Sequence, residues 1–310
     1  MELKKRFDLS WNTIRNPNWS IIFLLNLKIV ILSQFVSQFL RNILGILYLK
    51  TMRDFRGSGD KTMALVLGNG PLEMPFPYEI IDRLQNSEKI CIYGVNFVIN
   101  SSLATRITVN NLILSDPKTL DLESKNKKVK KLWTNIEKYK PNLFIPYSYY
   151  RNLHKYYEYA NCIYLFNDLS LETISKNINP MFPRGYPSST FLKAFAIALF
   201  AGHKQIYISG ADQSMFTKVS VNNLNRIIQF PSHRRGAEGG EDNYQYGIDI
   251  TSSYRNGLAD YFFDISNLHL AFKMYFKNFD KVTYVGNSFH DFYNKISIND
   301  FKVLLKKRLK

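Results

Sequence analysis

The sequence predicts an α/β fold: a mostly parallel, Rossmann-like sheet with helices on both faces, preceded by an amphipathic helical appendage at the N-terminus. The first observation is that short apolar runs alternate with longer segments of helical periodicity from Lys61 onward. Such alternation is typical of parallel sheets covered by helices. The second observation is size, since 310 residues with 45% hydrophobic content can bury the core of one large domain.

The elements follow in chain order after residue 60. The expected strands are short apolar runs: Met63–Leu67, Ile90–Tyr93, Leu112–Leu114, Leu143–Ile145, Ile163–Phe166, Gln205–Ser209 and Val282–Val285. The expected helices lie between them: Tyr78–Gln85, Leu120–Lys138, Ser188–Ala201 and Asn267–Phe279. No internal repeat is apparent, so we expect residues 61–310 to form one domain.

Residues 1–60 form a separate N-terminal segment. Residues 19–49 are strongly apolar but interrupted by polar side chains, so no run reaches the ~20 residues that a membrane-spanning helix needs. The second half has helical periodicity with one apolar face: Phe35, Val36, Phe39, Leu40, Ile43, Leu44 and Leu47. With basic residues on both flanks, this pattern favours a helix lying on an anionic membrane surface; the alternative is a helix packed on protein. Polar residues 54–60 are expected to link it to the domain.

The net charge of +16 favours an anionic partner, either a membrane surface or a phosphorylated or acidic sugar. No motif typical of nucleic-acid recognition accompanies the charge, so nucleic acid is not expected as a partner. The two cysteines, Cys91 and Cys162, both lie in apolar runs and are expected to be buried, reduced thiols. A cytoplasmic setting follows from that expectation.

Polar residues recur directly after the predicted strands. The first strand runs into Gly68-Asn69-Gly70, where two glycines let backbone N–H groups approach a phosphate or ribose. Asn96 follows the second strand and Asp116 follows the third. Asp212 comes after the strand that ends at Ser209. In parallel α/β sheets ligands bind at the carboxyl ends of the strands, so we expect a binding site there.

A further cluster precedes the helix expected from Ser188 to Ala201. Ser188 or Ser189 can cap this helix, whose N-terminus presents unpaired N–H groups and a partial positive charge. Such a helix end is suited to an anion. Arg184, four residues earlier, could add a bidentate contact.

Taken in order, several segments resemble bacterial CMP-sialic-acid-dependent sialyltransferases that decorate lipooligosaccharide, and related nonulosonate transferases. They are LVLGNGP from residue 65, VNFVIN from 95, SDP from 115, AFAIALFAGHKQIYISGAD from 194 and KVTYVGNSFHDFYNKI from 281. The resemblance covers Met63–Ile296 and is most specific from Ser188 to Asp212.

The resemblance implies roles for individual residues. Asn69 and Asn96 would contact the nucleotide or the donor phosphate, and Asp116 stands where the family has a donor-contacting asparagine. Arg184, Ser188 and Ser189 would hold the donor carboxylate or phosphate. The family is inverting and metal-independent, so neither a metal nor another cofactor is expected. The absence of an Asp-x-Asp motif agrees with that expectation.

Two departures from the family concern the chemistry. The tyrosine that assists the leaving group has no counterpart in Gln213-Ser214-Met215-Phe216, and Tyr244 or Tyr246 is the candidate substitute. The family's histidine base is also missing from its usual place. We therefore expect His233 to act as the base, with Asp260 second, because an imidazole titrates near neutral pH. The remaining histidines His203, His269 and His290 are expected to be structural.

These features together predict a glycosyltransferase that moves a sugar, expected to be sialic acid or a related acidic sugar, from a CMP donor to a cell-surface glycan or glycolipid. A peripheral location on the cytoplasmic face of the inner membrane would fit such an acceptor. Homo-oligomerisation stays open. Two alternatives are a pyrophosphokinase of the archaeal pterin type, which would require Mg²⁺, and a degenerate transferase that acts as a membrane scaffold.

Overall fold

The computed structural model divides the chain into two compact units, Met1–Thr51 and Met52–Lys310. It describes residues 36, 52–59, 63–68, 76–101, 103–104, 106–171, 176–210, 219–229, 248–253, 256–276, 281–286 and 294–308. In the first unit only Val36 is described; it is helical and exposed. The rest of the amphipathic helix predicted within residues 19–49 lies outside the described residues.

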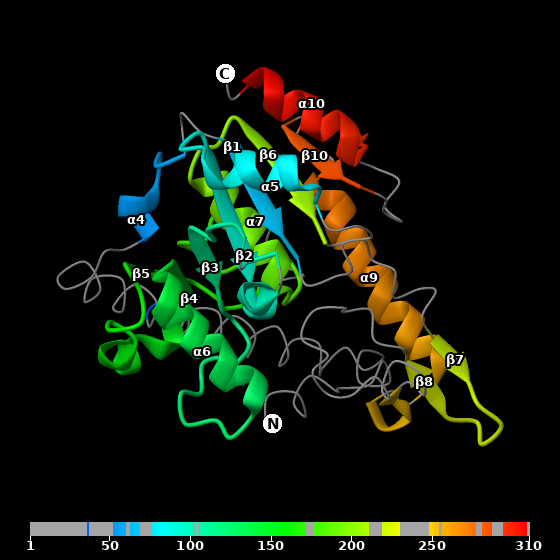
Figure 1. Cartoon of the computed structure of the whole chain (residues 1–310). Helices are drawn as coiled ribbons and strands as arrows, with labels where there is room; N and C mark the ends of the chain where they lie inside the picture. The colour runs from blue at the N-terminus through cyan, green and yellow to red at the C-terminus, as the bar shows by residue number, and fades with distance from the viewer. Residues whose placement is uncertain are drawn as a thin grey trace. The chain divides into compact units, whose positions relative to one another are not determined.

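The described part of the second unit is built on an eight-stranded sheet in which all neighbouring strands are parallel (Figure 1). The strands are β1 (Met63–Leu67), β2 (Ile90–Val95), β3 (Asn111–Ile113), β4 (Asn142–Pro146), β5 (Ile163–Phe166), β6 (Gln205–Ser209), β10 (Val282–Val285) and β11 (Asn294–Ile296). Their order is β11-β10-β6-β1-β2-β3-β4-β5. The chain therefore builds one wing from β1 to β5 and the other from β6 to β11, and the order reverses between β1 and β6.

Helices and a small second sheet complete the unit. The α-helices are α4 (Met52–Phe55), α5 (Tyr78–Gln85), α6 (Lys127–Tyr139), α7 (Thr190–Phe200), α9 (Leu258–Phe276) and α10 (Ile298–Arg308). The 3₁₀-helices are η1 (Asn96–Asn100), η2 (Tyr147–Lys155) and η4 (Thr251–Ser253). An antiparallel sheet contains β7 (Val219–Val221), β8 (Ile227–Gln229) and β9 (Ile248–Asp249).

Helix α7 is the central helix of the core. It packs against β1, β2 and β3, and its residues from Phe191 to Ala198 are all buried. This burial explains its sequence, because a helix that is apolar all round must be enclosed by other elements. Helix α6, by contrast, buries one face through Val129, Leu132, Trp133 and Ile136 and exposes most of its lysines.

The predicted α/β class is confirmed, and β1, β5, β6, β10 and α5 have the predicted bounds. Helix α6 begins later than predicted, at Lys127, for an identifiable reason. Asp121 Oδ1 accepts from the backbone N–H of Glu123, and Ser124 Oγ accepts from that of Asn126. These side chains favour turns over helix, and Asn126 then caps α6.

Several elements were not predicted: β11, α10, the antiparallel sheet, and the short helices α4, η1, η2 and η4. Strand β11 is short and polar, Asn-Lys-Ile, and α10 carries charges over much of its length. Neither has the apolar run or the strong periodicity on which the other predictions depend. None of the helices in the described residues combines the length and hydropathy needed to cross a membrane.

Residues 52–59 belong to the second unit and pack on it, although residues 54–60 were expected to be a linker. The Phe55 ring lies 4.8 Å from that of Phe144 and 5.1 Å from that of Tyr164, between ring centroids. The Gly59 N–H donates to the Ala201 carbonyl at 2.8 Å. A Cβ at Gly59 would lie 2.6 Å from the His203 ring, so only glycine fits. Residues 52–59 are therefore closely packed against the rest of the second unit.

His203 itself is buried and shares a hydrogen bond of 2.7 Å between its Nε2 and the Tyr93 hydroxyl. Its ring also contacts the Tyr93 ring edge-on, with centroids 5.5 Å apart. These contacts give His203 a structural role in joining β2, the end of α7 and the Gly59 turn.

Candidate functional site

The reversal of strand order between β1 and β6 is the place where α/β sheets of this kind bind ligands, beyond the carboxyl ends of the strands. Two glycines make the backbones approach closely there. The Gly68 N–H donates to the Ser209 carbonyl at 2.8 Å. Gly210 has φ +73°, and a Cβ on it would lie 2.7 Å from the Gly68 carbonyl oxygen. Both the backbone angle and the close contact therefore require glycine at position 210.

Asn96 stands directly after β2, at the same edge of the sheet. It begins η1 with φ 43°, in the left-handed region that asparagine tolerates better than most residues. Its Nδ2 donates to the Thr190 hydroxyl at 3.2 Å. Its Oδ1 is buried and has no hydrogen-bond partner among the described residues. Turning the amide over would only exchange the two atoms, so one polar atom of Asn96 remains unpaired in either orientation.

Thr190 joins three elements at this edge. Its hydroxyl lies 2.6 Å from the hydroxyl of Ser115, which follows β3, and it also accepts from Asn96 after β2. Thr190 is the first residue of α7, so the helix begins where β2 and β3 end. The neighbouring side chains leave the first turn of α7 well suited to an anion. Ser189 occupies the N-cap without a side-chain hydrogen bond to the helix, and the first turn contains no acidic residue.

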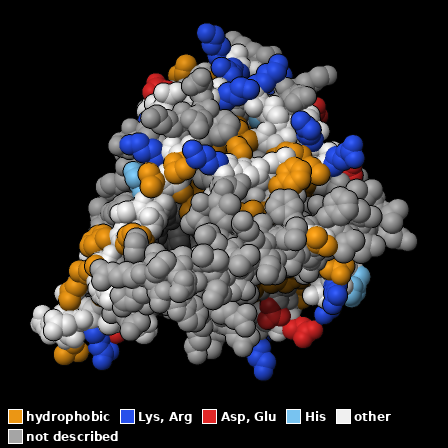
Figure 2. All heavy atoms as spheres, turned by 180° about the vertical axis from the view of Figure 1, so that it is seen from behind, with side chains coloured by type: hydrophobic (Ala, Val, Ile, Leu, Met, Phe, Trp, Pro, Cys, Tyr) orange, Lys and Arg blue, Asp and Glu red, His pale blue; other side chains and the backbone are white. Residues whose placement is uncertain are grey.

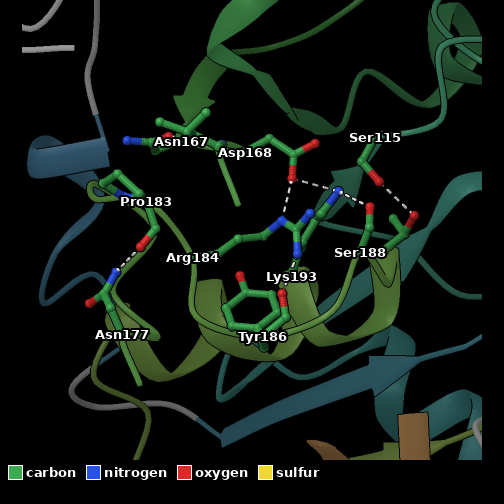
Figure 3. Close-up of polar contacts among 11 residues, drawn as sticks. Ser115, Asn167, Asp168, Asn177, Pro183, Arg184, Tyr186, Ser188 and Lys193 are labelled. Carbon is green, nitrogen blue, oxygen red and sulfur yellow. Dashed lines mark hydrogen bonds and ion pairs between the residues drawn. The ribbon is translucent and has the colours of Figure 1, made fainter. Parts of the chain in front are cut away.

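An ion cluster with two buried cations and one partly exposed carboxylate lies beside this helix end (Figure 3). The Asp168 carboxylate, which follows β5, is 2.7 Å from Lys193 Nζ and 3.1 Å from Arg184 Nε. Lys193 and Arg184 are only 2% and 6% exposed. Lys193 also reaches the Ser188 hydroxyl at 3.4 Å, and an Arg184 guanidinium nitrogen donates to the Tyr186 carbonyl. The cluster therefore ties the segment before α7, and α7 itself, to the end of β5.

Arg184 and Ser188 were predicted to hold a donor anion, and the structure places both in this cluster. Arg184 Nε is directed at Asp168, so that part of the guanidinium supports the protein rather than a ligand. Because one carboxylate stands between two cationic groups, the geometry fixes Ser188 and the first turns of α7. Placement of the helix N-terminus is thus the chemical role that these contacts support.

Asn167 precedes Asp168 and is buried, with only 5% of its surface exposed. Its Oδ1 accepts from the Leu169 N–H at 3.0 Å, whereas its Nδ2 has no partner among the described residues. Figure 3 draws its amide on the other side of the backbone from the Asp168 carboxylate. Asn96 and Asn167 therefore each leave one buried polar atom unsatisfied near a strand's carboxyl end.

Asp116 is half-buried after β3, where it forms a tight turn. Its Oδ1 accepts from the Lys118 N–H at 2.9 Å, and its carbonyl accepts from Thr119. Tyr149 of η2 lies close to Asp116. Burial and, to a smaller extent, the Asp116 charge raise the pKa of the Tyr149 phenol. Asp116 therefore lies at the carboxyl edge, as predicted, between the ends of β3 and β4.

The other predicted residues are placed less centrally or are not described. Asp260 lies in the first turn of α9, where its carboxylate accepts from the N–H of Asn256 at 2.9 Å and from Asn256 Nδ2 at 3.0 Å. Six residues lie outside the described part of the chain: Asn69, Gly70, Asp212, His233, Tyr244 and Tyr246. Their predicted roles stay predictions.

Ser115, Asp168, Thr190 and Lys193 are site residues that the sequence reasoning missed. A signal existed for two of them. Lys193 is a lone charge inside the apolar helix TFLKAFAIALF, and a buried lysine demands a carboxylate partner. Asp168 follows a strand end, the same pattern that singled out Asn96 and Asp116. Within the described residues, no group of three or more His, Cys, Asp or Glu side chains could hold a metal ion.

Neither a scan of protein-family models nor a search of curated proteins finds a match to this chain. Among solved structures, the MAf glycosyltransferase from Magnetospirillum magneticum AMB-1 is similar at 16% identity, over 54% of this chain and 24% of that chain, with a TM-score of 0.34. That structural neighbour is a glycosyltransferase. The match spans about a quarter of its length, and at this TM-score the function of the present chain has to be argued from its own residues.

Proposed function

We propose that this protein is a glycosyltransferase that binds a nucleotide-activated sugar at the carboxyl edge of its sheet, across the reversal between β1 and β6. One observation carries the proposal. Asn96, Ser115 and Thr190 meet at the N-terminus of α7, and a buried amide atom of Asn96 is left without a partner among the described residues. An unsatisfied buried polar atom costs about 1–3 kcal/mol, which a bound ligand would recover.

The chemistry of the edge fits the parts of a nucleotide sugar. The first turn of α7, uncapped by Ser189, suits a phosphate, because a helix N-terminus presents N–H groups and a partial positive charge to an anion. The free amide atom of Asn96 suits a ribose or sugar hydroxyl. The close approach of Gly68 and Gly210 leaves the backbone without side chains that would block a nucleotide.

The donor in this proposal is a CMP-linked acidic sugar, supported by the resemblance of Met63–Ile296 to CMP-sialic-acid-dependent transferases. The acceptor hydroxyl oxygen would attack the anomeric carbon while the bond from that carbon to the CMP phosphate oxygen breaks, which inverts the configuration. The phosphate leaves with the bonding electrons, and a base takes the hydroxyl proton. His233 is the proposed base, with Asp260 second, and Tyr244 would donate to the departing phosphate.

The acceptor in this proposal is a glycan or glycolipid, with the protein held peripherally at the cytoplasmic face of the inner membrane. The support is the amphipathic pattern of residues 19–49 with its basic flanks. The proposed reaction needs no metal, since the phosphate charge would be met by the helix N-terminus and hydroxyl donors.

Thermal unfolding with CMP, UMP, GMP and ATP, in EDTA and in Mg²⁺, tests the proposal. We expect CMP to raise the midpoint in EDTA, and Asn96→Asp to abolish the rise, because a carboxylate at this position repels the phosphate. Asn96→Gly relieves the left-handed backbone and removes only the amide, so it should weaken CMP binding less. Stabilisation by ATP alone, and only with Mg²⁺, would favour a pyrophosphokinase instead.

Activity separates an enzyme from a scaffold. Incubation with CMP-sialic acid should release CMP from the wild-type protein, and Asn96→Asp should remove that release. Wild-type protein that binds CMP but never turns the donor over, with or without a glycan acceptor, would contradict the catalytic part of the proposal.

A further inference from the structure

Lysine side chains gather at the amino edge of the sheet, on the side away from the candidate donor site. Lys89, Lys204 and Lys281 directly precede β2, β6 and β10, and all three are exposed. They are neighbours in space, because the Lys89 carbonyl accepts from the Met63 N–H at 2.8 Å and the Lys281 carbonyl from the Ile206 N–H at 2.9 Å. The three lysines therefore line one stretch of edge across β2, β1, β6 and β10.

The last turn of α10 adds three more cations to this stretch. Because β11 is parallel to its neighbours, α10 begins near the carboxyl edge and runs back, so that Lys306, Lys307 and Arg308 end near the amino edge. The Arg308 charge lowers the pKa of Tyr207 in β6, against the larger raising effect of burial, which places Arg308 near that strand. Figure 2 shows Lys and Arg side chains gathered at the top of the molecule, where Figure 1 places α10.

These six residues, Lys89, Lys204, Lys281, Lys306, Lys307 and Arg308, form what we name the basic edge. All six side chains belong to residues that are exposed. At the α5 end of this edge the described residues include two exposed carboxylates, Asp82 and Glu88. Cations thus outnumber carboxylates along it, and the surface favours an extended anionic partner.

We propose that the basic edge docks on an anionic lipid bilayer. Charge complementarity is one argument, since exposed Lys and Arg residues bind the negative surface of a membrane within about a Debye length, roughly 8–10 Å. The path of the chain is another. After α4 it reaches the amino edge at Gly59, whose N–H bonds to Ala201, three residues from Lys204. Within the second unit, residues 52–59 therefore run from the β5 side of the sheet to the amino edge.

Docking in this way would fix how the candidate donor site faces the membrane. With the amino edge on the lipid, the carboxyl edge faces the aqueous phase, from which a nucleotide sugar arrives. A five-residue strand spans roughly 17 Å, so the candidate donor site would stand at least that far from the lipid. If the protein has the proposed function, its acceptor would have to be an extended glycan rather than a sugar at the membrane surface.

The test uses the full chain and vesicles of phosphatidylcholine alone or with 30% phosphatidylglycerol, separated by sedimentation. The variant is Lys306→Gln/Lys307→Gln/Arg308→Gln. The matched control, Lys127→Gln/Lys130→Gln/Lys131→Gln, removes the same charge from exposed positions in the first half of α6, which starts towards the carboxyl edge. Each charge near an anionic surface contributes roughly fivefold in affinity, so the triple change on α10 should weaken binding by about a hundredfold if all three charges reach the surface.

We expect the α6 control to bind anionic vesicles within about threefold of the wild type, and neither protein to bind neutral vesicles strongly. Equal losses in both variants, or no loss in the α10 variant, would overturn the proposal. Unchanged vesicle binding together with lost binding to a single-stranded oligonucleotide would point to nucleic acid instead. Thermal stabilisation by CMP, measured on the same samples, reports on the proposed function independently, because no substituted residue lies at the donor site.

Discussion

Asparagines lie at both edges of the sheet, but their side chains are hydrogen-bonded to one another only at the amino edge. There they form a chain of hydrogen bonds. Asn161 Nδ2 donates to Asn142 Oδ1 at 3.1 Å, Asn142 Nδ2 donates to Asn111 Oδ1 at 3.1 Å, and Asn111 Nδ2 donates to Cys91 Sγ at 2.9 Å. Each amide in this chain supplies the partner that the next one needs, so the strands β2 to β5 are tied together at their starts.

At the carboxyl edge, two asparagines each keep one side-chain atom without a hydrogen-bond partner. Asn96 Oδ1 and Asn167 Nδ2 are buried and unpaired among the described residues. Buried polar groups in native proteins are almost always paired, so an exception calls for a reason. The amino edge therefore uses its asparagines for stability, whereas the carboxyl edge keeps unpaired amide atoms that a ligand can bind.

The largest effect on stability is expected at the ion cluster of the carboxyl edge. Asp168→Ala removes the carboxylate that faces both Lys193 and Arg184, and removing one partner from a buried ion pair costs about 3–5 kcal/mol. Urea unfolding measures the loss. Glu79→Ala removes the partner of Lys302 on the surface and should leave the midpoint almost unchanged. A small loss at Asp168, similar to that at Glu79, would show that the cluster does not anchor α7.

The amino edge should give a pH dependence of intermediate size. Burial raises the pKa of the Cys91 thiol to about 11 from the ordinary value of 9.0, an effect partly offset by hydrogen bonds from Tyr93 and Asn111. The folded protein therefore holds this proton more tightly than the unfolded chain does. Stability from the neutral thiol is complete below pH 9 and is lost as the pH rises to 11, by up to about 2–3 kcal/mol.

Urea unfolding at pH 8 and at pH 10.5 measures this loss. Cys91→Ala should reduce the difference between the two pH values without removing it, because burial also raises the pKa of Tyr93 and Tyr207. Cys162→Ala keeps Cys91 and should retain the full difference. An unaltered difference in Cys91→Ala would mean that other groups cause the alkaline loss of stability.

A smaller effect is expected from the asparagine chain itself. Asn111→Ala leaves Asn142 and Cys91 without their shared partner and should cost about 1–3 kcal/mol. Its stabilisation by CMP, measured as a shift of the thermal midpoint, should equal that of the wild type. If this variant folds but its thermal midpoint no longer rises with CMP, the amino edge takes part in binding and the two edges do not have separate roles.

The sequence predicted the bounds of β1, β5, β6 and β10 correctly, because each is an apolar run bounded by polar residues. Strand-end polar residues also placed Asn96 and Asp116 at the correct edge. The pairing of Ser115 with Thr190 was out of reach, since the two are 75 residues apart and each is an ordinary polar residue in its own segment. Such pairs depend on which strand ends lie next to α7, and that follows from the strand order rather than from local pattern.

Hydrogen–deuterium exchange of the full-length protein with and without CMP tests whether a donor binds at the carboxyl edge. We expect slower exchange in peptides that cover residues 94–101 and 188–195, with no change in those covering 86–92 and 201–206. Protection of the amino-edge peptides alone, or of neither set at a saturating CMP concentration, would contradict it.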